Sequence, residues 1–252
     1  MSNREISKTF VKGIRVLRAF DDADTHLTLA DLAVKTGLDR ASVRRLVLTL
    51  VELGYVRKSG RSFVLTPRVL ALAGSFFQGN AFGIEVQPLL NRFSERLEGP
   101  VSLSIREEDA AVFVGQSAPR NQPVTFGFTV GSRLPLSHTA IGRMILAYDD
   151  PAQTVTYLSE TPLQQYTASS LTDRDAIAAS VTTCRTHGFA IVDNEFEAGV
   201  TAFAVPVGPI GGLKAVVGTS FPNSGSPDPT RIIPILQELA RELAHTRLFR
   251  DT

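Results

Sequence analysis

Cysteine is almost absent from this sequence, and long apolar runs are missing altogether. The 252 residues contain one cysteine, Cys184. A single cysteine cannot build an internal disulfide framework, which favours a reducing compartment. No apolar run approaches the roughly 20 residues that a membrane-spanning helix requires. The first ten residues, MSNREISKTF, lack the apolar core of a signal peptide. We therefore expect a cytoplasmic protein with no membrane partner.

Signatures of catalysis and metal binding are also missing. The sequence has no GxSxG elbow, no GxxxxGK[ST] loop and no GxGxxG after a strand. The histidines at positions 26, 138, 187 and 245 show no clustered metal spacing. Cys184 and His187 lie three apart on one expected helix, but they lack a third ligand or an orienting acid, so we interpret them as structural. We predict no metal, no cofactor and no enzymatic activity.

Charge is nearly balanced over the chain but unevenly distributed along it. The net charge is +1, with 43% apolar and 20% charged residues, which is typical of a globular protein. Residues 1–75 contain 13 Lys/Arg and 7 Asp/Glu, a net charge of +6. Residues 76–252 contain 13 Lys/Arg and 18 Asp/Glu, a net charge of −5. This asymmetry predicts that only the first part of the chain meets a polyanion.

The segment from Leu27 to Arg61 has the pattern of two short helices, a tight turn and a basic hairpin. Thr28 is placed to cap the first helix, and Asp31 completes a capping box. Gly37 ends that helix, because glycine adopts the left-handed conformation without steric cost. Asp39 is placed to cap the second helix. The spacing predicts a helix-turn-helix.

The second helix divides into an apolar face and a basic face. Residues expected to be buried recur at helical spacing: Val43, Leu46, Val47, Leu50 and Leu53. The opposite side carries Arg40, Ala41, Arg44, Arg45 and Leu48. Arginine pairs with guanine acceptors or with phosphate, and the small Ala41 and Ser42 permit close approach to a major groove. We interpret this helix as the one that reads DNA.

The hairpin expected between Tyr55 and Leu65, with Ser59-Gly60 at its turn, places basic residues beside that helix. A basic tip of this kind is what a wing needs to hold adjacent phosphate. An amphipathic helix comes first, with apolar residues at helical spacing from Phe10 to Phe20, so three helices and a wing form a winged helix-turn-helix domain. The predicted DNA contacts are Thr28, Arg40, Ala41, Ser42, Arg44, Arg45, Arg57, Lys58 and Arg61.

A plainer interpretation of the same segment is a helical pair with a solvated charged face. Charge runs are usually no more than that, and short motifs give false positives. Here the caps, the turn glycine, the basic helix face and the basic hairpin occur in the right order. Because these independent features agree, we favour the DNA-binding interpretation.

The sequence pattern changes after the hairpin, from that of a DNA-binding domain to that of a linker and a second domain. Thr66-Pro67 has the form of a helix start, and the pattern breaks at Gly79 to Gly83. We expect three parts: a winged helix-turn-helix domain at 1–66, a linker helix and hinge at 67–83, and a second domain at 84–252. Alternating apolar residues predict strands near 101–105, 110–114, 124–130, 189–192, 201–207 and 213–220. Helices are expected at 84–97, at 140–148, from a Thr172 cap to His187, and at 230–249. The second domain is therefore expected to be α+β, with an antiparallel sheet.

These residues resemble the IclR family of bacterial transcription regulators over essentially the whole chain. The matching segments in the first domain are VLRAF, LTLADLAVKTGL, VRRLVLTLVELGYV and FVLTPRVLAL. In the second domain they are VGSRLPLSHTAIGRMILA, GFAIVDNEFEAGVTAFAVPV and LKAVVGTSFP. The segments RASVRRLVLTLVELGYVRKSGR and GRMILA are most similar to the subgroup that controls breakdown of protocatechuate, 4-hydroxybenzoate and related acids.

The resemblance implies a GAF-like effector-binding second domain, and dimers that form through the N-terminal part and often pair into tetramers. It also implies an effector pocket at Thr139, Ala140, Val192, Asp193, Ala202 and the strand end from Gly218 to Ser220. Backbone N–H groups at the helix start after Thr139 are suited to a carboxylate. Some family members carry cysteine or serine at the position of Ala202 and serine at that of Gly218, so a very small polar effector is disfavoured.

Other side chains near these positions have two interpretations each. Phe126, Phe128 and Phe203 either line an apolar pocket or belong to ordinary core packing. Arg133 either pairs with an effector carboxylate or forms a surface or interface salt bridge. His138 lies beside the expected pocket, where a lone histidine is more often structural.

The sequence therefore predicts a ligand-responsive transcription regulator without enzymatic activity. Its partners would be a pseudo-palindromic double-stranded DNA operator and a small carboxylate, an aromatic acid or related catabolite. As a homodimer, or a dimer of dimers, it would set two reading helices in major grooves about 34 Å apart. DNA binding would keep it at the nucleoid. The alternatives are an enzyme acting on a small acid with an accessory DNA-binding module, and a non-specific architectural DNA binder.

Overall fold

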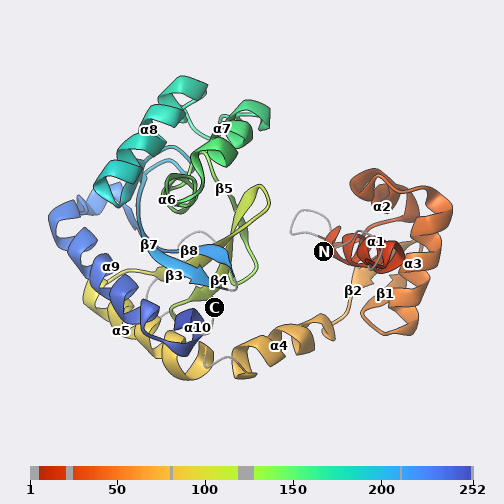
Figure 1. Cartoon of the computed structure of the whole chain (residues 1–252). Coiled ribbons are helices and arrows are strands. Elements are labelled where there is room, and N and C mark those ends of the chain that lie inside the picture. The colour runs from red at the N-terminus through yellow and green to blue at the C-terminus, as the bar shows by residue number, and fades with distance from the viewer. Residues whose placement is uncertain (1–5, 21–24, 80–81, 119–127, 211, 251–252) are drawn as a thin grey trace. The chain divides into compact units, whose positions relative to one another are not determined.

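The chain folds into two compact units, Met1–Phe77 and Gln78–Thr252, shown in Figure 1. A computed structural model describes residues 6–20, 25–79, 82–118, 128–210 and 212–250. Within these ranges no helix is long and apolar enough to cross a membrane. Each unit has its own core and is described by itself below.

The first unit is a three-helix domain with a two-stranded antiparallel hairpin. Its elements are α1 (Lys8–Arg18), α2 (Leu29–Thr36), α3 (Arg40–Glu52), β1 (Val56–Ser59) and β2 (Ser62–Leu65), followed by α4 (Val69–Gly79). The helix caps are those the sequence predicts. Thr28 and Asp31 form a reciprocal capping box, Gly37 is left-handed at φ 65°, and the Asp39 side chain accepts from the backbone N–H of Ser42 at 2.8 Å.

The core of the first unit lies between α1, α2, α3 and the hairpin. Its buried members include Val16, Leu32, Val43, Val47 and Phe63. The hairpin is attached to the start of α2 by two backbone bonds between Leu27 and Phe63, at 2.8 and 3.1 Å. Leu53 was expected in this core, but its side chain is 52% exposed because α3 ends at Glu52 and Leu53 turns away as the C-cap.

The second unit is built on a six-stranded antiparallel sheet with strand order β5-β4-β3-β8-β7-β6. The strands are β3 (Val101–Glu107), β4 (Ala110–Gln116), β5 (Arg133–Pro135), β6 (Ala190–Asp193), β7 (Val200–Ile210) and β8 (Leu213–Pro222). The helical elements are η1 (Phe82–Val86), α5 (Gln87–Leu97), α6 (Ala140–Tyr148), α7 (Pro151–Glu160), α8 (Arg174–His187), η2 (Asn223–Gly225), α9 (Pro229–Ala244) and α10 (Arg247–Arg250).

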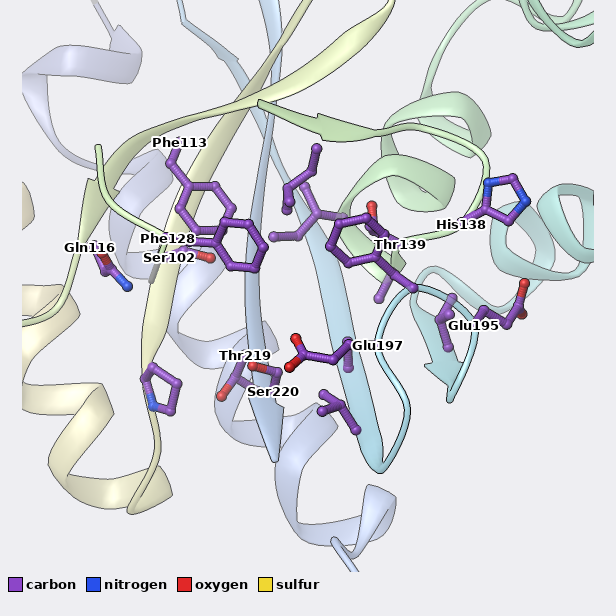
Figure 2. Close-up of a pocket in the computed structure, with 18 residues that line it drawn as sticks. Ser102, Phe113, Gln116, Phe128, His138, Thr139, Glu195, Glu197, Thr219 and Ser220 are labelled. Atoms are coloured by element: carbon purple, nitrogen blue, oxygen red, sulfur yellow. The ribbon is translucent and has the colours of Figure 1, made fainter. Parts of the chain in front are cut away.

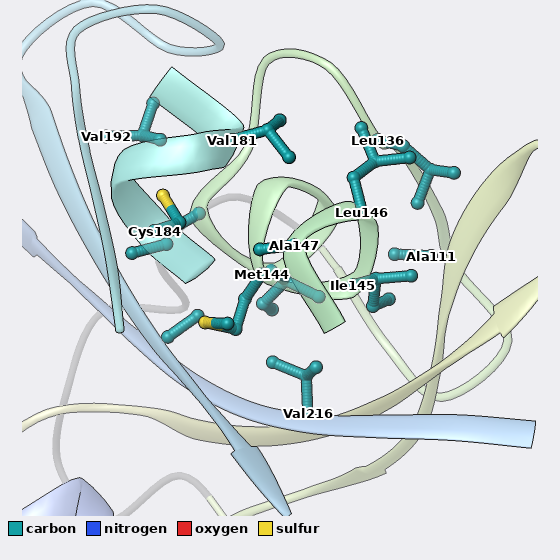
Figure 3. Close-up of a cluster of buried hydrophobic side chains, with 14 of the residues drawn as sticks. Ala111, Leu136, Met144, Ile145, Leu146, Ala147, Val181, Cys184, Val192 and Val216 are labelled. Atoms are coloured by element: carbon teal, nitrogen blue, oxygen red, sulfur yellow. The ribbon is translucent and has the colours of Figure 1, made fainter. Parts of the chain in front are cut away.

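Helices cover both faces of this sheet. One face contacts α6, the central helix of the unit, and a Cβ on Gly218 of β8 would lie 2.7 Å from Ile141 of α6. The other face contacts α5 and α9, and a Cβ on Gly115 of β4 would lie 2.5 Å from Phe82. Figure 3 shows α6 packed between β8 and α8, with Met144, Ile145 and Leu146 in the cluster. Residues 140–147 of α6 are all buried, so this helix is fixed on every side.

Several elements of the second unit differ from the sequence-based expectation. The strand expected at 124–130 lies partly outside the described residues, and residues 128–130 are not a strand. The chain turns there instead, with Gly131 at φ 97° and the Ser132 N–H bonded to the Thr129 carbonyl. The short strand β5 follows, where no strand was expected. Helix α7 was not predicted, although Asp150 caps it and Pro151 occupies its first position.

Two helix ends also differ. Asp173, not Thr172, caps α8, and its carboxylate accepts from the Ala176 N–H at 2.9 Å. A charged acceptor forms the stronger cap bond, which explains the choice. The single closing helix expected at 230–249 is two helices, because α9 ends at Ala244 and the buried Thr246 hydroxyl donates to the Leu243 carbonyl. Strand β7 extends to Ile210, beyond the end at 207 that was expected.

Gly142 provides a test of the close packing around α6. A Cβ at this position would lie 2.3 Å from Leu136 Cα and 2.6 Å from the Pro135 carbonyl oxygen. Because these contacts are with backbone, Gly142→Ala should destabilise the second unit by about 1–3 kcal/mol. Gly74→Ala is the control, since nothing lies within 4 Å of its Cβ, and a gain of about 0.5–1 kcal/mol is expected for this helical position. Urea unfolding measures both; equal stabilities would contradict this packing.

Candidate DNA-binding surface and effector pocket

The outer face of α3 presents the basic side chains to solvent. Arg40, Ala41, Arg44 and Arg45 are exposed, while Val43, Val47 and Leu50 are buried on the opposite side. Arg57, Lys58 and Arg61 are exposed on the hairpin, whose two-residue turn is Gly60-Arg61. Within the described part of the chain, none of these basic side chains forms an ion pair. They are therefore available to an external anion such as DNA phosphate.

A surface hollow brings the helix starts and the wing together. It is lined by Thr28, Leu29, Ala30, Arg40, Ala41, Arg44 and Arg61. The N-termini of α2 and α3 both open toward it, and helix N-termini favour anions. The Thr28 hydroxyl is already engaged in the capping box, where it donates to Asp31 at 2.7 Å. Thr28 thus contributes to this surface mainly by holding the start of α2 in place.

The second unit contains a pocket between the sheet, the start of α6 and the β6–β7 loop (Figure 2). It offers about 100 Å³ that a water-sized group can occupy. One buried water needs roughly 10–15 Å³ on this scale, so the space suits a molecule of about seven to ten non-hydrogen atoms. The lining residues are Pro100, Ser102, Phe113, Gln116, Phe128, Leu134, His138, Thr139, Ala140, Ile141, Val192, Glu195, Phe196, Glu197, Val200, Ala202, Thr219 and Ser220.

Aromatic rings form much of the pocket wall. Phe128 contacts Phe113 edge-on, with ring centroids 6.2 Å apart, and lies 6.0 Å from Phe196. Phe196 contacts Tyr166, which in turn contacts the His138 ring at 5.3 Å. Burial raises the pKa of Tyr166 above its ordinary value. Such a wall favours a flat apolar group, since aromatic pairs prefer edge and offset contacts.

The start of α6 supplies polar groups to the pocket. Thr139 is the N-cap, and its hydroxyl accepts from the Gly142 N–H at 3.0 Å and donates to the Pro135 carbonyl at 2.9 Å. Ala140 and Ile141 occupy the first two helical positions and line the pocket. Their N–H groups have no partner inside the helix. They are the donors that a carboxylate in the pocket would meet.

A buried ion pair holds the β6–β7 loop against the pocket. The Arg143 guanidinium of α6 donates to both carboxylate oxygens of Glu195, at 2.7 and 2.5 Å, and both residues are buried. Arg143 also donates to the Ser137 carbonyl at 2.9 Å and to the Ser180 hydroxyl at 3.1 Å. The Ser170 hydroxyl donates to the Glu195 carbonyl at 2.6 Å. This network joins four segments around the pocket.

The importance of Arg143 and Glu195 was missed by the sequence reasoning. Both lie inside quoted segments, Arg143 in GRMILA and Glu195 in GFAIVDNEFEAGVTAFAVPV, but 52 positions separate them. The one available signal was an arginine in a helix that is otherwise apolar. A charge on such a helix requires a buried partner, because an unpaired buried charge is costly.

Most of the predicted effector-binding residues come together in this pocket. Those that line it are Phe128, His138, Thr139, Ala140, Val192, Ala202 and Ser220. His138 is also structural, as its Nε2 lies 2.9 Å from the Leu171 carbonyl oxygen. Phe126 lies outside the described residues. Phe203 is fully buried and does not line the pocket.

Three predicted residues lie elsewhere. The Arg133 guanidinium is paired with Glu107 at 2.6 Å and Asp109 at 2.9 Å, so the salt-bridge interpretation holds for it. The Asp193 carboxylate is exposed; hydrogen bonds from Thr201 first, and then from neighbouring amides, lower its pKa. Gly218 packs beneath Ile141 rather than in the lining. The sequence placed these three residues near the pocket but did not show which way each of them faces.

Comparison with known proteins identifies the family. Residues 9–60 match the IclR helix-turn-helix domain, and residues 82–246 match the bacterial transcriptional regulator IclR C-terminal domain. The chain belongs to the IclR family. The winged helix-turn-helix and the α+β second unit with an antiparallel sheet are thus confirmed. So are the resemblance to this family and the prediction of a DNA-binding transcription regulator rather than an enzyme.

Two curated relatives and one solved structure show the extent of the similarity. The Pca regulon regulatory protein of Pseudomonas putida is 31% identical over 241 residues, 94% of this chain and 83% of that protein. The p-hydroxybenzoate hydroxylase transcriptional activator of Acinetobacter baylyi is 26% identical over 92% of this chain and 89% of that protein. An IclR homolog from Microbacterium hydrocarbonoxydans, complexed with 4-hydroxybenzoate, has a TM-score of 0.73 at 22% identity, over 97% of this chain and 100% of that one.

The ion pair under the β6–β7 loop predicts strong coupling between its members. Arg143→Met leaves Glu195 buried without a partner and should lower the free energy of unfolding by about 3–5 kcal/mol. The double variant Arg143→Met/Glu195→Leu removes both charges, so it should recover much of that loss. Urea unfolding of the single and double variants measures the coupling. Additive losses in the double variant would show that the two charges do not depend on each other.

Proposed function

We propose that this IclR-family regulator binds a pseudo-palindromic operator as a dimer and responds to an aromatic monocarboxylic acid held in the second-unit pocket. The observation that carries the proposal is the pocket itself, which combines aromatic walls with the free N–H groups at the start of α6. The carboxylate would meet those N–H groups, and the ring would lie against Phe113 and Phe128. The relative named for p-hydroxybenzoate hydroxylase and the structure with 4-hydroxybenzoate support this class of ligand.

The DNA contacts are proposed as predicted, with α3 in the major groove and the hairpin on the backbone. Arg40, Ser42, Arg44 and Arg45 would contact bases and phosphates, with Ala41 close to the groove floor. Arg57, Lys58 and Arg61 would hold adjacent phosphate. Operator binding would keep the protein at the nucleoid, within the cytoplasm. We propose that residues 1–66 bind DNA, that residues 67–83 form the linker, and that residues 84–252 bind the effector.

Apolar side chains on the first unit support self-association. Phe10 and Ile14 on α1 are 70% and 40% exposed, and Leu70 and Leu72 on α4 are 68% and 56% exposed. Large exposed apolar groups of this kind favour a protein partner. The dimer would use these helices, and a dimer of dimers would follow as in the family. An effector regulates only if it binds two arrangements of the dimer with different affinity.

Arg44 and Arg45 test the assignment of the reading helix. Arg44→Ala and Arg45→Ala should each weaken binding to the DNA upstream of the protein's own gene, by about 1–3 kcal/mol where the arginine reads a base. A residue that contacts phosphate should instead lower the dependence of log K on log salt by about one. Fluorescence anisotropy at several fixed salt concentrations separates the two. Unchanged affinity in both variants would reject α3 as the reading helix.

Ala202 tests the pocket separately from DNA binding. Ala202→Phe fills the pocket, so binding of aromatic acids should be lost while operator affinity without acid is kept. Ala202→Ser is the matched control, because it adds one oxygen and leaves the space open. Calorimetry with a panel of aromatic and dicarboxylic acids, and anisotropy with operator DNA, measure both properties. An acid that still binds Ala202→Phe with wild-type affinity would place the effector elsewhere.

A further inference from the structure

The pocket contains a carboxylate whose partner is missing among the described residues. Glu197 lies on the β6–β7 loop, lines the pocket and is half-buried. Figure 2 shows its carboxylate extending from the loop toward the end of β8, where Thr219 and Ser220 lie, and away from Thr139. Within the described ranges Glu197 forms no hydrogen bond and no ion pair. Burial raises the pKa of Glu197, because keeping its carboxylate charged away from water costs free energy.

The neighbouring carboxylate, Glu195, is in a different situation. It is neutralised by Arg143 and takes part in the loop network. The described lining contains neither lysine nor arginine, so no side-chain cation there faces Glu197. The two polar ends of the pocket therefore have opposite character. The start of α6 offers N–H donors, and Glu197 offers a charged acceptor.

We propose that Glu197 accepts a hydrogen bond from a hydroxyl group of the bound aromatic acid, and that it thereby selects phenolic acids over unsubstituted ones. This assignment rests on the proposed function, because it takes the effector carboxylate to lie at the start of α6. With the carboxylate there, the far side of the ring faces the Glu197 end of the pocket. A phenolic O–H is a good donor, and bonds to an ionised acceptor are short and strong.

The same geometry predicts which acids are rejected. Benzoate has no donor at the far side of the ring, so binding it leaves the Glu197 carboxylate desolvated and unsatisfied. Terephthalate places a second carboxylate there, which meets the like charge of Glu197. Selection at this end of the pocket thus depends on hydrogen bonding and charge. The aromatic wall accepts the rings of benzoate, terephthalate and the hydroxybenzoates equally.

The experiment is calorimetric titration of the full-length protein with benzoate, 3-hydroxybenzoate, 4-hydroxybenzoate and terephthalate. The pH is kept at about 7.5, where the carboxyl group of a phenolic acid is ionised and its phenol is not. The variants are Glu197→Gln, which keeps an acceptor but removes the charge, and Glu197→Leu, which removes both. Glu160→Gln is the control, since Glu160 is an exposed carboxylate at the end of α7 and is not part of the lining. Thermal unfolding checks that each variant is folded.

In the wild type, at least one hydroxybenzoate should bind about tenfold tighter than benzoate or better, as expected for a hydrogen bond to a charged group. Terephthalate should bind weaker than benzoate. Glu197→Leu should abolish the preference for the hydroxyl and admit terephthalate, and Glu197→Gln should retain part of the preference. The Glu160 control should match the wild type.

Two different failures are distinguishable. If the wild type binds benzoate and both hydroxybenzoates equally, or if Glu197→Leu keeps the wild-type preference, the assignment of Glu197 is wrong and the proposed function stands. If no aromatic acid binds the wild type, the proposed function itself fails, and the role of Glu197 fails with it. Retained preference in Glu197→Gln together with its loss in Glu197→Leu would identify the hydrogen bond, rather than the charge, as the selecting interaction.

Discussion

The buried ion pair between Arg143 and Glu195 is the interaction on which the second unit most depends. It links α6, the innermost helix, to the loop that covers the pocket. Two charges taken out of water are stabilising only when their geometry is good and their remaining groups are bonded. Both conditions hold here, since the pair is bidentate and its free atoms bond to Ser137, Ser180 and the backbone at Leu171. Glu195 and Glu197 thus stand two residues apart on one loop with different roles, one fixed by its partner and one open to a ligand.

The fixed helix and the covering loop explain why the pocket lies where it does. Helix α6 covers one face of the sheet. It begins shortly after Leu136, whose backbone packs so closely against the helix that only glycine fits at position 142. The first N–H groups of α6 therefore lie at the pocket, next to the strand ends and the aromatic wall. A helix start buried without side-chain partners for every N–H is costly. A bound carboxylate would offset that cost, which couples the stability of the unit to ligand binding.

The amount that could be predicted differs between the two units. In the first, capping residues, the turn glycine and the basic face of α3 are local signals, and the structure places them as the sequence predicts. In the second, the strands and α6 were found from alternation and from the family resemblance, while α7, β5 and the end of α9 were not. Strand β5 has only three residues and forms by pairing with β4, which precedes it by about twenty positions. Helix α7 and the end of α9 have local cap signals, at Asp150 and Thr246, that hydrophobic periodicity does not record.

The sequence by itself determined the helix-turn-helix and the hairpin, because their caps and turn follow from spacing within single segments, where each residue fixes the conformation of its neighbours. The family, and with it the general position of the pocket at the start of α6, came from the resemblance of the quoted segments to known regulators. Only the tertiary structure decided which side chains face the pocket. It removed Arg133, Asp193 and Gly218, added Glu197, Phe113 and Phe196, and paired Arg143 with Glu195. The physical reason is that a strand end or loop can present either of two faces, and the choice is made by packing against elements distant in sequence.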